Sequence, residues 1–289
     1  MCPVIIDTDC AIDDLRAIVM LAACRNINIK AVVTSDGTLP PKEGAGKVAA
    51  LLYTFGRKDI PIGVGRKFNQ NPPFWRNFSS TIYWGDEPKI DTSRFFGATD
   101  LLREIISATQ KKITLVCLGP LTNIADLLKQ CAECSSKIHR ILWYVESVIP
   151  EMKGSNYDTD PESAKQVMDS GIRLFCISAL GKPSVTIDND YISIVSSLDT
   201  IYAKAILDSF LSPGMKEKIE TKHLKLWDDL VPLFIISPEN FQVAVHPENP
   251  QIFYTFDFQA DFLKAKVYSV LAGYAIYEDK QVSIIDYKE

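Results

Sequence analysis

The sequence predicts an α/β fold built on an open, mainly parallel, doubly wound sheet. Short runs of apolar and β-branched residues alternate with longer stretches in which apolar residues recur at helical spacing. Several of these runs end in aspartate, glycine or proline, which are typical of turns. Strand-then-helix repetition of this kind builds a parallel sheet covered by helices on both faces. Residues 1–180 are therefore expected to form one doubly wound unit.

The first elements set this pattern. Residues 4–9 (VIIDTD) are β-branched and apolar and stop at aspartates, so they predict a buried strand. Residues 13–25 predict a helix that begins near Asp13, and residues 27–37 predict a second strand that ends in a polar turn. The alternation then continues as helix 47–56, strand 60–66, helix 98–110, strand 112–120, helix 121–131, strand 138–145, helix 161–171 and strand 172–180.

Ligands bind beyond the carboxyl ends of the strands in sheets of this kind. The positions that follow predicted strands should therefore line one crevice. These positions are Asp7, Asp9, Gly37, Gly119-Pro120 and the segment after Trp143.

The last third of the chain departs from the alternation. Residues 190–211 and 224–238 predict helices, and residues 241–259 are strand-like. No low-complexity linker and no internal repeat is apparent. Residues 1–289 are therefore expected to form a single domain with helical and β additions in the C-terminal third.

Composition narrows the class of protein. The chain has 289 residues, 47% of them hydrophobic and 23% charged, with a formal net charge of −5 and no lysine/arginine run. We therefore expect neither a nucleic-acid nor a membrane partner. No apolar stretch approaches the roughly 20 residues that span a bilayer. Met1-Cys2-Pro3 leads directly into the first strand, so we expect no signal peptide.

The cysteines indicate a reducing compartment. The seven cysteines are an odd number and lie mostly in apolar surroundings, which favours a cytoplasmic location over a disulfide framework. Cys131 and Cys134 have the spacing of a redox or zinc pair, but no second Cys/His pair lies at a recognisable spacing. We expect two ordinary thiols on a helix turn.

Four aspartates crowd the end of the first predicted strand: Asp7, Asp9, Asp13 and Asp14. Such a cluster is tolerated if some carboxylates are protonated, or if a hard cation such as Ca²⁺ supplies the missing positive charge. The favourable field at a helix N-terminus accounts for Asp13 or Asp14 singly, but not for Asp7 and Asp9 as well. The spacing favours a metal site.

Four segments together resemble the inosine-uridine preferring nucleoside hydrolases, which are calcium enzymes that cleave the N-glycosidic bond of ribonucleosides. The stretch from Asp7 to Asp14 looks like the family's DTDxxxDD signature. Residues 119–125 (GPLTNIA), residues 156–164 (NYDTDPESA) and Trp227-Asp228 are similar to later family motifs, in the same order. The resemblance covers residues from about 4 to about 240, and it implies the fold of that family.

The resemblance also implies the roles of individual residues. Asp13 and Asn156 would bind ribose hydroxyls, and Asp7 would orient the metal ligands. A water activated by the metal and by Asp9 would attack the sugar. Family members are commonly dimers or tetramers, so a homodimer or homotetramer is expected. The implied calcium ligands are Asp9, both oxygens of Asp14, the main-chain carbonyl of Thr122, and Asp228.

Two tryptophans are the candidates for binding the nucleobase. Trp84 and Trp227 fall where some members carry base-side histidines, and a purine-preferring branch stacks the base between tryptophans. Stacking of this kind contributes about 1–3 kcal/mol per base in other settings. Purine ribosides are therefore the first expected substrates. The alternative is that both tryptophans belong to the core.

Three departures affect the substrate end. Gly37-Thr38 replaces a family Gly-Asn pair, and Tyr144-Val-Glu146 replaces a Gly-Gly. Gly154-Ser155 replaces a Glu-Phe whose glutamate would bind the ribose 5′-hydroxyl. The substrate is then expected to lack an ordinary 5′-hydroxyl, to extend beyond it, or not to be a standard nucleoside. Lys153 is a candidate partner for a 5′ substituent, with a solvated surface lysine as the alternative.

Two other functions fit parts of the pattern. A phosphatase of the haloacid dehalogenase type also begins with a strand ending in Asp-x-Asp and uses Mg²⁺, but it leaves Asp13-Asp14 and Asp228 without a role. A relative that binds a ribose-containing ligand without turnover fits the altered 5′ end, although such a protein has no need for a base at Asp9. Ligand binding without product formation would identify it.

Overall fold

The computed structural model describes residues 1–68, 71–86, 95–180, 182 and 185–285. The strands are β1 (Cys2–Thr8), β2 (Ile27–Thr34), β3 (Ile62–Val64), β4 (Phe96–Gly97), β5 (Ile113–Cys117), β6 (Ile138–Tyr144), β7 (Leu174–Ile177), β8 (Phe241–His246), β9 (Asn249–Phe258) and β10 (Ile284–Ile285). The α-helices are α1 (Ile12–Ala23), α2 (Pro41–Thr54), α3 (Arg76–Thr81), α4 (Ala98–Ala108), α5 (Thr122–Gln130), α6 (Ser155–Thr159), α7 (Pro161–Met168), α8 (Asn189–Ser196), α9 (Ile201–Phe210), α10 (Met215–Glu220), α11 (Leu230–Ile236) and α12 (Ala260–Leu271).

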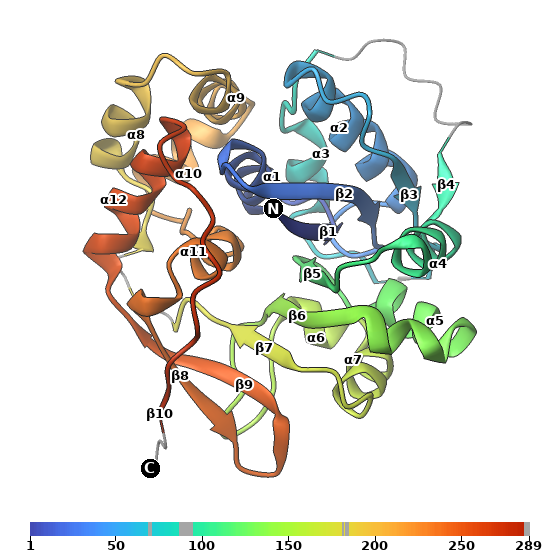
Figure 1. Cartoon of the computed structure of the whole chain (residues 1–289). Coiled ribbons are helices and arrows are strands. Elements are labelled where there is room, and N and C mark those ends of the chain that lie inside the picture. The colour runs from blue at the N-terminus through green and yellow to red at the C-terminus, as the bar shows by residue number, and fades with distance from the viewer. Residues whose placement is uncertain (69–70, 87–94, 181, 183–184, 286–289) are drawn as a thin grey trace.

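All ten of these strands join one sheet, in the order β10-β8-β9-β7-β6-β5-β1-β2-β3-β4 (Figure 1). Neighbouring strands are parallel except for β8 and β9, which pair antiparallel. The structure therefore confirms the predicted open, mainly parallel α/β class. Strands from the C-terminal third extend the same sheet that the first 180 residues begin.

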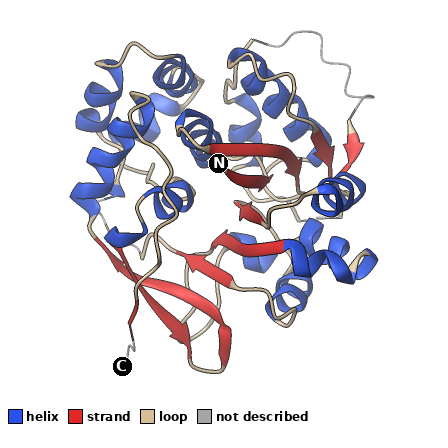
Figure 2. Ribbon diagram, viewed as in Figure 1, coloured by secondary structure: helices blue, strands red, loops and turns tan. Residues whose placement is uncertain are grey.

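Helices cover the sheet on both faces (Figure 2). Helix α1 packs against α9, α11 and α12, while α5 packs against α4 and α7. Val4 and Ile6 of β1 belong to the core that contains α1, whereas Ile5 belongs to the core that contains α4 and α5. This alternation is what a strand buried on both faces produces, because successive side chains point to opposite sides.

The strand order places β1 at the point where the winding of the sheet reverses. From β1 the chain moves to β2, β3 and β4 on one side, and later strands add β5, β6 and β7 on the other. The carboxyl ends of β1 and β5 are therefore adjacent, and the connections that leave them diverge. Ligand sites in doubly wound sheets lie at such a point.

The C-terminal third differs from the prediction in detail. The stretch 190–211 is two helices, α8 and α9, because the Thr200 hydroxyl accepts a hydrogen bond from the N–H of Ala203 and starts a new helix there. Within 224–238 the only α-helix is α11, and a 3-10 turn begins at Pro238. The N–H of Leu226 donates to the carbonyl of Val185, so the chain before α11 is held extended. The strand-like stretch 241–259 is a hairpin formed by β8 and β9.

The expectation for Cys131 and Cys134 was wrong. Helix α5 ends at Gln130, and the backbone of Cys131 leaves the helical region. The following turn brings the two residues to a Cα–Cα distance of 5.4 Å, where they form a disulfide. The other five cysteines are free and buried. Within the described ranges, no helix combines the length and apolarity that crossing a bilayer requires.

Candidate active site

A cavity of about 520 Å³ lies beyond the carboxyl ends of the central strands. Asp9 and Tyr144 line it, as expected for positions that follow β1 and end β6. Gly37 and Gly119 pack directly against Asp9, where a side chain at either position would overlap it. The lining residues are Asp9, Ala11, Ile12, Asp13, Asp14, Thr38, Phe74, Trp75, Phe78, Ser79, Leu118, Tyr144, Glu146, Ser155, Asn156, Lys218, His223, Leu224, Trp227 and Asp228.

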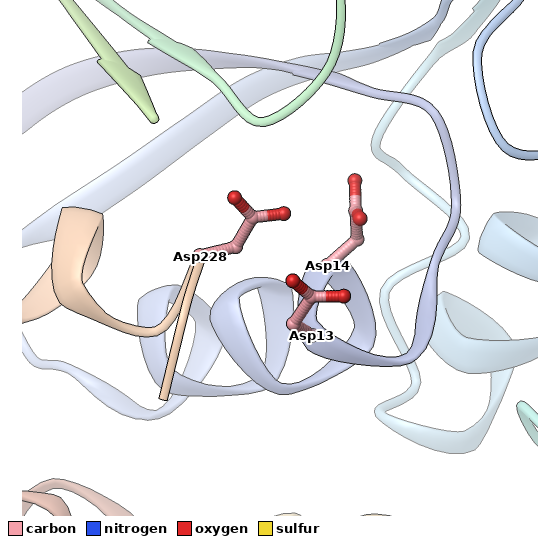
Figure 3. Close-up of side chains that lie close together, drawn as sticks. All are labelled: Asp13, Asp14 and Asp228. Carbon is pink, nitrogen blue, oxygen red and sulfur yellow. The ribbon is translucent and has the colours of Figure 1, made fainter. Parts of the chain in front are cut away.

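Three predicted residues meet at this cavity. Carboxylate oxygens of Asp13, Asp14 and Asp228 lie within 4.8 Å of one another. The first two come from the start of α1, and Asp228 comes from the segment just before α11 (Figure 3). The fold therefore joins the first family motif to a residue more than 200 positions later in the chain.

The Asp14 carboxylate is held by the chain around it. It accepts hydrogen bonds from the Thr8 hydroxyl and from the N–H groups of Asp9 (3.2 Å), Cys10 (3.3 Å) and Ala11 (3.0 Å). These contacts satisfy N–H groups at the start of α1, where helical partners are missing. Asp14 therefore accepts hydrogen bonds at the start of a helix, as acidic residues commonly do, and it is also a member of the carboxylate cluster.

The residue next to Asp228 forms a buried ion pair that holds this segment in place. The Arg16 guanidinium donates to both oxygens of Asp229, at 2.9 and 2.8 Å, and to the carbonyl of Lys225 at 2.8 Å. The side chains of Arg16 and Asp229 are both fully buried. Asp228 itself is 2% exposed, and its Oδ1 has no hydrogen-bond partner among the described residues. A buried carboxylate oxygen without a donor is an open ligand position.

Asp9 stands beside this cluster. Its Oδ2 accepts a hydrogen bond from the Thr38 N–H at 2.8 Å. The Arg76 guanidinium donates to the carbonyls of Gly37 and Thr38, both at 2.7 Å, and so holds the turn that carries this N–H. Thr38 thus anchors Asp9 from the position where the family pattern has an asparagine.

The electrostatics of these groups call for a positive charge. Burial is the largest cause that raises the pKa of Asp9 to about 7 and the pKa of Asp13 to about 6. Burial and repulsion from neighbouring carboxylates raise the pKa values of Asp14 and Asp228 well above their usual range. Clustered carboxylate oxygens are the ligands that hard divalent cations prefer. The donor set and the open Asp228 oxygen therefore fit a divalent metal ion.

Asp7, which was expected to line the crevice, is buried and is not among the residues that line the cavity. Its Oδ1 accepts a hydrogen bond from the Asn123 amide at 3.0 Å, and the same amide donates to the carbonyl of Thr34 at 3.1 Å. Burial raises the pKa of Asp7 to about 8. Asn123 had no role in the sequence interpretation, although it lies within the GPLTNIA motif that signalled the family.

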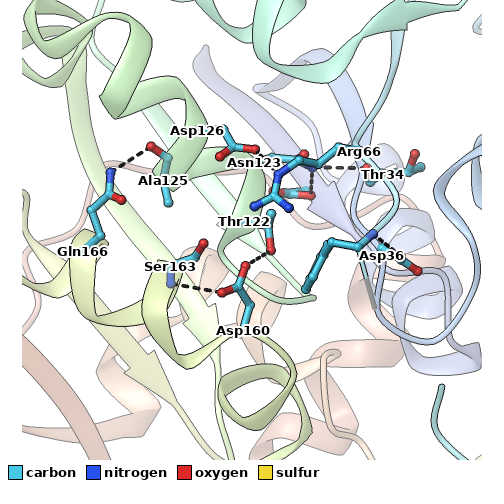
Figure 4. A network of polar contacts seen from close by, with 12 residues as sticks. Thr34, Asp36, Arg66, Thr122, Asn123, Ala125, Asp126, Asp160, Ser163 and Gln166 are labelled. Atoms are coloured by element: carbon cyan, nitrogen blue, oxygen red, sulfur yellow. Dashed lines mark hydrogen bonds and ion pairs between the residues drawn. The ribbon is translucent and has the colours of Figure 1, made fainter. Parts of the chain in front are cut away.

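Thr122 is the first residue of α5. Its hydroxyl donates to Asp160 at 2.5 Å, and the other Asp160 oxygen caps α7 by accepting from the Ser163 N–H at 3.1 Å (Figure 4). This network ties two family motifs together. The coordination of a metal by the Thr122 carbonyl remains a prediction.

The side chain of Asn156 is held by two main-chain carbonyl groups. Its amide group donates to the carbonyls of Leu118 (2.9 Å) and Tyr144 (3.1 Å). Both amide hydrogens are therefore engaged, and the carboxamide oxygen is left as an acceptor. Since Asn156 lines the cavity, this oxygen is available to a ligand hydroxyl.

The aromatic residues of the cavity differ from the prediction. Trp227 lines the cavity, but Trp84 is 3% exposed and belongs to the hydrophobic core, so the base-stacking role predicted for it does not fit its position. Phe74, Trp75 and Phe78 line the cavity instead. Trp75 is oriented by a 3.2 Å hydrogen bond from its Nε1 to the Thr38 hydroxyl. Residues 74–78 (FWRNF) supply these three aromatic side chains, and this cluster in the sequence could have indicated the aromatic lining.

Two basic residues also line the cavity and were not predicted as site residues. Lys218 lies over the Phe78 ring at 4.5 Å. His223 lines the wall as well, and its Nδ1 lies 2.7 Å from the Thr221 hydroxyl. Lys218 belongs to α10 and His223 to the segment that follows it, and neither segment carries a motif that was recognised in the sequence.

Comparisons with known proteins identify the family of this chain. The inosine-uridine preferring nucleoside hydrolase family profile matches residues 4–267. The pyrimidine-specific ribonucleoside hydrolase RihA of Escherichia coli O1:K1 is 27% identical over 257 residues, which cover 83% of this chain and 81% of that protein.

Solved structures establish the same fold at lower identity. A plant nucleoside hydrolase superposes with a TM-score of 0.79 at 18% identity, over 93% of this chain and 98% of the other. The purine-preferring ribonucleoside hydrolase of Gardnerella vaginalis gives a TM-score of 0.77 at 17% identity, over 94% and 98%. Profile, relatives and fold lead to one conclusion: this chain belongs to the inosine-uridine preferring nucleoside hydrolase family, and it is an N-ribosyl hydrolase.

Proposed function

We propose that this chain cleaves the N-glycosidic bond of ribonucleosides to free base and ribose in a calcium-dependent reaction. The group formed by Asp13, Asp14 and Asp228, with its open Asp228 oxygen, is the observation that carries the proposal. A bound divalent cation offsets carboxylate charge and makes water more acidic. The proposed ligands are the side chains of Asp9, Asp14 and Asp228 and the main-chain carbonyl of Thr122.

Asp9 is the residue that we assign to proton transfer. In its ionised form it accepts a proton from the attacking water while the sugar acquires oxocarbenium character. Its orientation is set in advance by the Thr38 N–H, so the carboxylate needs no rearrangement during the reaction. General base catalysis of this kind contributes about 10²- to 10⁴-fold to a rate.

The ribose is assigned to Asp13 and Asn156. The carboxylate of Asp13 and the free carboxamide oxygen of Asn156 are both acceptors on the cavity wall. Acceptors of this kind suit the vicinal hydroxyls of a ribose. A deoxyribonucleoside leaves one of these groups without its donor and is therefore expected to be a poorer substrate.

The base is assigned to the aromatic residues Phe74, Trp75, Phe78 and Trp227. We keep purine ribosides as the proposed first substrates because two tryptophan faces line the cavity. The pyrimidine specificity of the Escherichia coli relative makes the pyrimidine ribosides the necessary comparison. A homodimer or homotetramer and a cytoplasmic location are further proposals, which rest on the resemblance and on the five buried free cysteines.

Reducing-sugar release from a panel of purine and pyrimidine ribonucleosides tests this function. Assays run with calcium, with magnesium alone and with a chelator, for the wild-type protein and for Asp9→Ala. We expect calcium-dependent release that the substitution reduces by at least about 10²-fold. Asp199→Ala is the matched control, because Asp199 is exposed and does not line the cavity.

The possible results separate the functions that fit the sequence. Membership of the family removes the phosphatase alternative. If the protein binds calcium and nucleosides but releases no sugar, it is the non-catalytic ribose-binding relative. Equal rates with calcium and with chelator contradict the proposed metal dependence.

A further inference from the structure

Glu146 holds a carboxylate at the cavity wall just beyond the end of β6. Its Oε1 accepts hydrogen bonds from the N–H and the hydroxyl of Ser155, both at 3.1 Å. Its main-chain carbonyl accepts a hydrogen bond from the Ser178 hydroxyl at 2.6 Å. Main chain and side chain are therefore both fixed. The second oxygen, Oε2, accepts no hydrogen bond from any part of the chain that the structure describes.

Gly154 provides the space for this carboxylate. A Cβ at Gly154 would overlap Oε2 of Glu146 and come within 2.9 Å of the Glu146 main-chain nitrogen. The backbone of Gly154 also has a φ of +134°, which side-chain-bearing residues rarely adopt. Two departures from the family pattern thus form one arrangement. Position 154 is a glycine where the family pattern has a glutamate, and the Glu146 carboxylate lies in the space that a side chain at position 154 would need.

The neighbours of Glu146 place it on the sugar side of the cavity. Its partner Ser155 precedes Asn156, the residue assigned to a ribose hydroxyl. The carbonyl of Tyr144, two residues before Glu146, holds the Asn156 amide. The aromatic residues assigned to the base come from other segments, around Trp75 and Trp227.

We infer that Glu146 is a specificity-determining residue whose free carboxylate oxygen accepts a hydrogen bond from the 5′-hydroxyl of the ribose. This inference rests on the proposed function. It replaces the sequence expectation of a substrate without an ordinary 5′-hydroxyl, because a carboxylate is present at that end of the cavity. The position that supplies it is different from the one in the family pattern.

The charge of Glu146 defines the substrate class further. An anionic group beside the 5′ position repels a 5′-phosphate, so the substrates are unphosphorylated ribonucleosides and not nucleotides. Lys153 does not offset this charge, because it pairs with Glu151 at 2.8 Å and does not line the cavity. Lys218, which does line it, lies over the Phe78 ring among the aromatic residues.

Paired substrates and variants test this inference. Hydrolysis and calorimetric binding are measured in parallel for a ribonucleoside, its 5′-deoxy analogue and its 5′-monophosphate, in the presence of calcium. Wild type is compared with Glu146→Ala and Glu146→Gln. The matched control is Glu151→Ala, which removes an exposed carboxylate from the same loop but outside the cavity.

We expect the wild type to prefer the ribonucleoside over the 5′-deoxy analogue by about 10- to 100-fold in kcat/KM or Kd, the range of a hydrogen bond to a charged group. Glu146→Ala is expected to lose most of that preference by acting less well on the ribonucleoside only. Glu146→Gln should keep more of it, and should bind the 5′-monophosphate better than the wild type does. Glu151→Ala should match the wild type.

Other results overturn the inference. If Glu146→Ala keeps the wild-type preference for the 5′-hydroxyl, the inference is wrong while the hydrolase function stands. If the wild type binds nucleosides without cleaving them, the binding data still decide the role of Glu146. If it neither binds nor cleaves any nucleoside, the proposed function fails first and the inference fails with it.

Discussion

The acidic and aromatic walls of the cavity are held in contrasting ways. Asp9, Asp14 and Asp228 are 7%, 0% and 2% exposed, and main-chain N–H groups or an adjacent buried ion pair fix them in place. On the aromatic wall Phe74 is 92% exposed, and Trp75 is only partly buried. The acidic side chains are buried in the fold, whereas the aromatic side chains range from Phe78 and Trp227, which pack against the core, to the exposed Phe74.

This difference follows from the two kinds of chemistry. A metal and a developing charge need oxygen atoms at fixed positions, because electrostatic stabilisation is strongest where the groups are oriented in advance. A base needs only a flat face to stack on, and every base offers one. Aromatic residues from different segments can therefore do this equally well, which is why Phe74, Trp75 and Phe78 stood out in no motif, whereas the acidic residues did.

The largest expected effect concerns the support of the acidic wall. Arg16→Met leaves Asp229 buried without its partner, which costs about 3–5 kcal/mol of unfolding free energy. Calcium affinity should fall as well, because the same ion pair positions the segment that carries Asp228. Urea denaturation in chelator and calcium titration measure the two effects.

Two further variants sharpen this prediction. Arg16→Met combined with Asp229→Leu should recover most of the lost stability, because no uncompensated charge remains. Arg57→Met, which breaks the exposed pair with Asp59, should cost no more than about 1 kcal/mol. An equal cost for Arg16→Met and Arg57→Met would show that the buried pair does not support the wall.

Asp228→Asn is expected to act in opposite directions with and without calcium. In metal-free protein the substitution removes a crowded carboxylate and should raise the melting temperature. Bound calcium at about 100 times its Kd should stabilise the wild type by about 2.7 kcal/mol, and this gain should be lost in the variant. Asp199→Asn, at an exposed position, should behave as the wild type does.

The pH dependence of the Asp228→Asn effect has a defined sign. The folded-state pKa of Asp228 is raised well above its unfolded value of about 3.8, mainly by burial. Its contribution to stability is therefore complete below about pH 4 and is lost as the pH rises through the folded pKa. In chelator, the stability advantage of the variant over the wild type should grow from pH 4 to pH 8. A constant advantage would contradict this.

The smallest expected effects concern the aromatic wall. Trp75→Ala and Trp227→Ala should each weaken nucleoside binding by about 1–3 kcal/mol, the contribution of one stacking contact. The loss should appear mainly in KM and should depend on the base. Trp84→Phe should reduce stability without changing base preference, because Trp84 lies in the core. A change of base preference in Trp84→Phe would contradict this and would indicate that Trp84 contributes to base binding.

Local sequence was sufficient for the centre of the acidic wall. Asp14 lies three residues after Ala11, so its carboxylate reaches the Ala11 N–H as soon as the helix starts, and Asp9 follows the last residue of β1 directly. Contacts within eight residues do not depend on how distant segments pack. The alternation of strands and helices was likewise visible, because a buried parallel sheet requires apolar runs at regular intervals.

The remaining features depend on segments that meet only in the folded chain. Arg16 binds Asp229, 213 residues further along the chain, and the adjacent Asp228 has an oxygen without a hydrogen-bond partner among the described residues. Glu146 reaches the cavity because Gly154 leaves space for it, and each residue alone looked like a defect in the motif.

The strand-and-helix alternation and the acidic residues around β1 could be read from residue order alone, since both depend on neighbours along the chain. Packing between distant segments decides three other features: which tryptophans line the cavity, how Glu146 lies against Gly154, and which Asp228 oxygen lacks a hydrogen-bond donor among the described residues. These are properties of packing between distant loops, and residue spacing along the chain does not encode the distances between such loops.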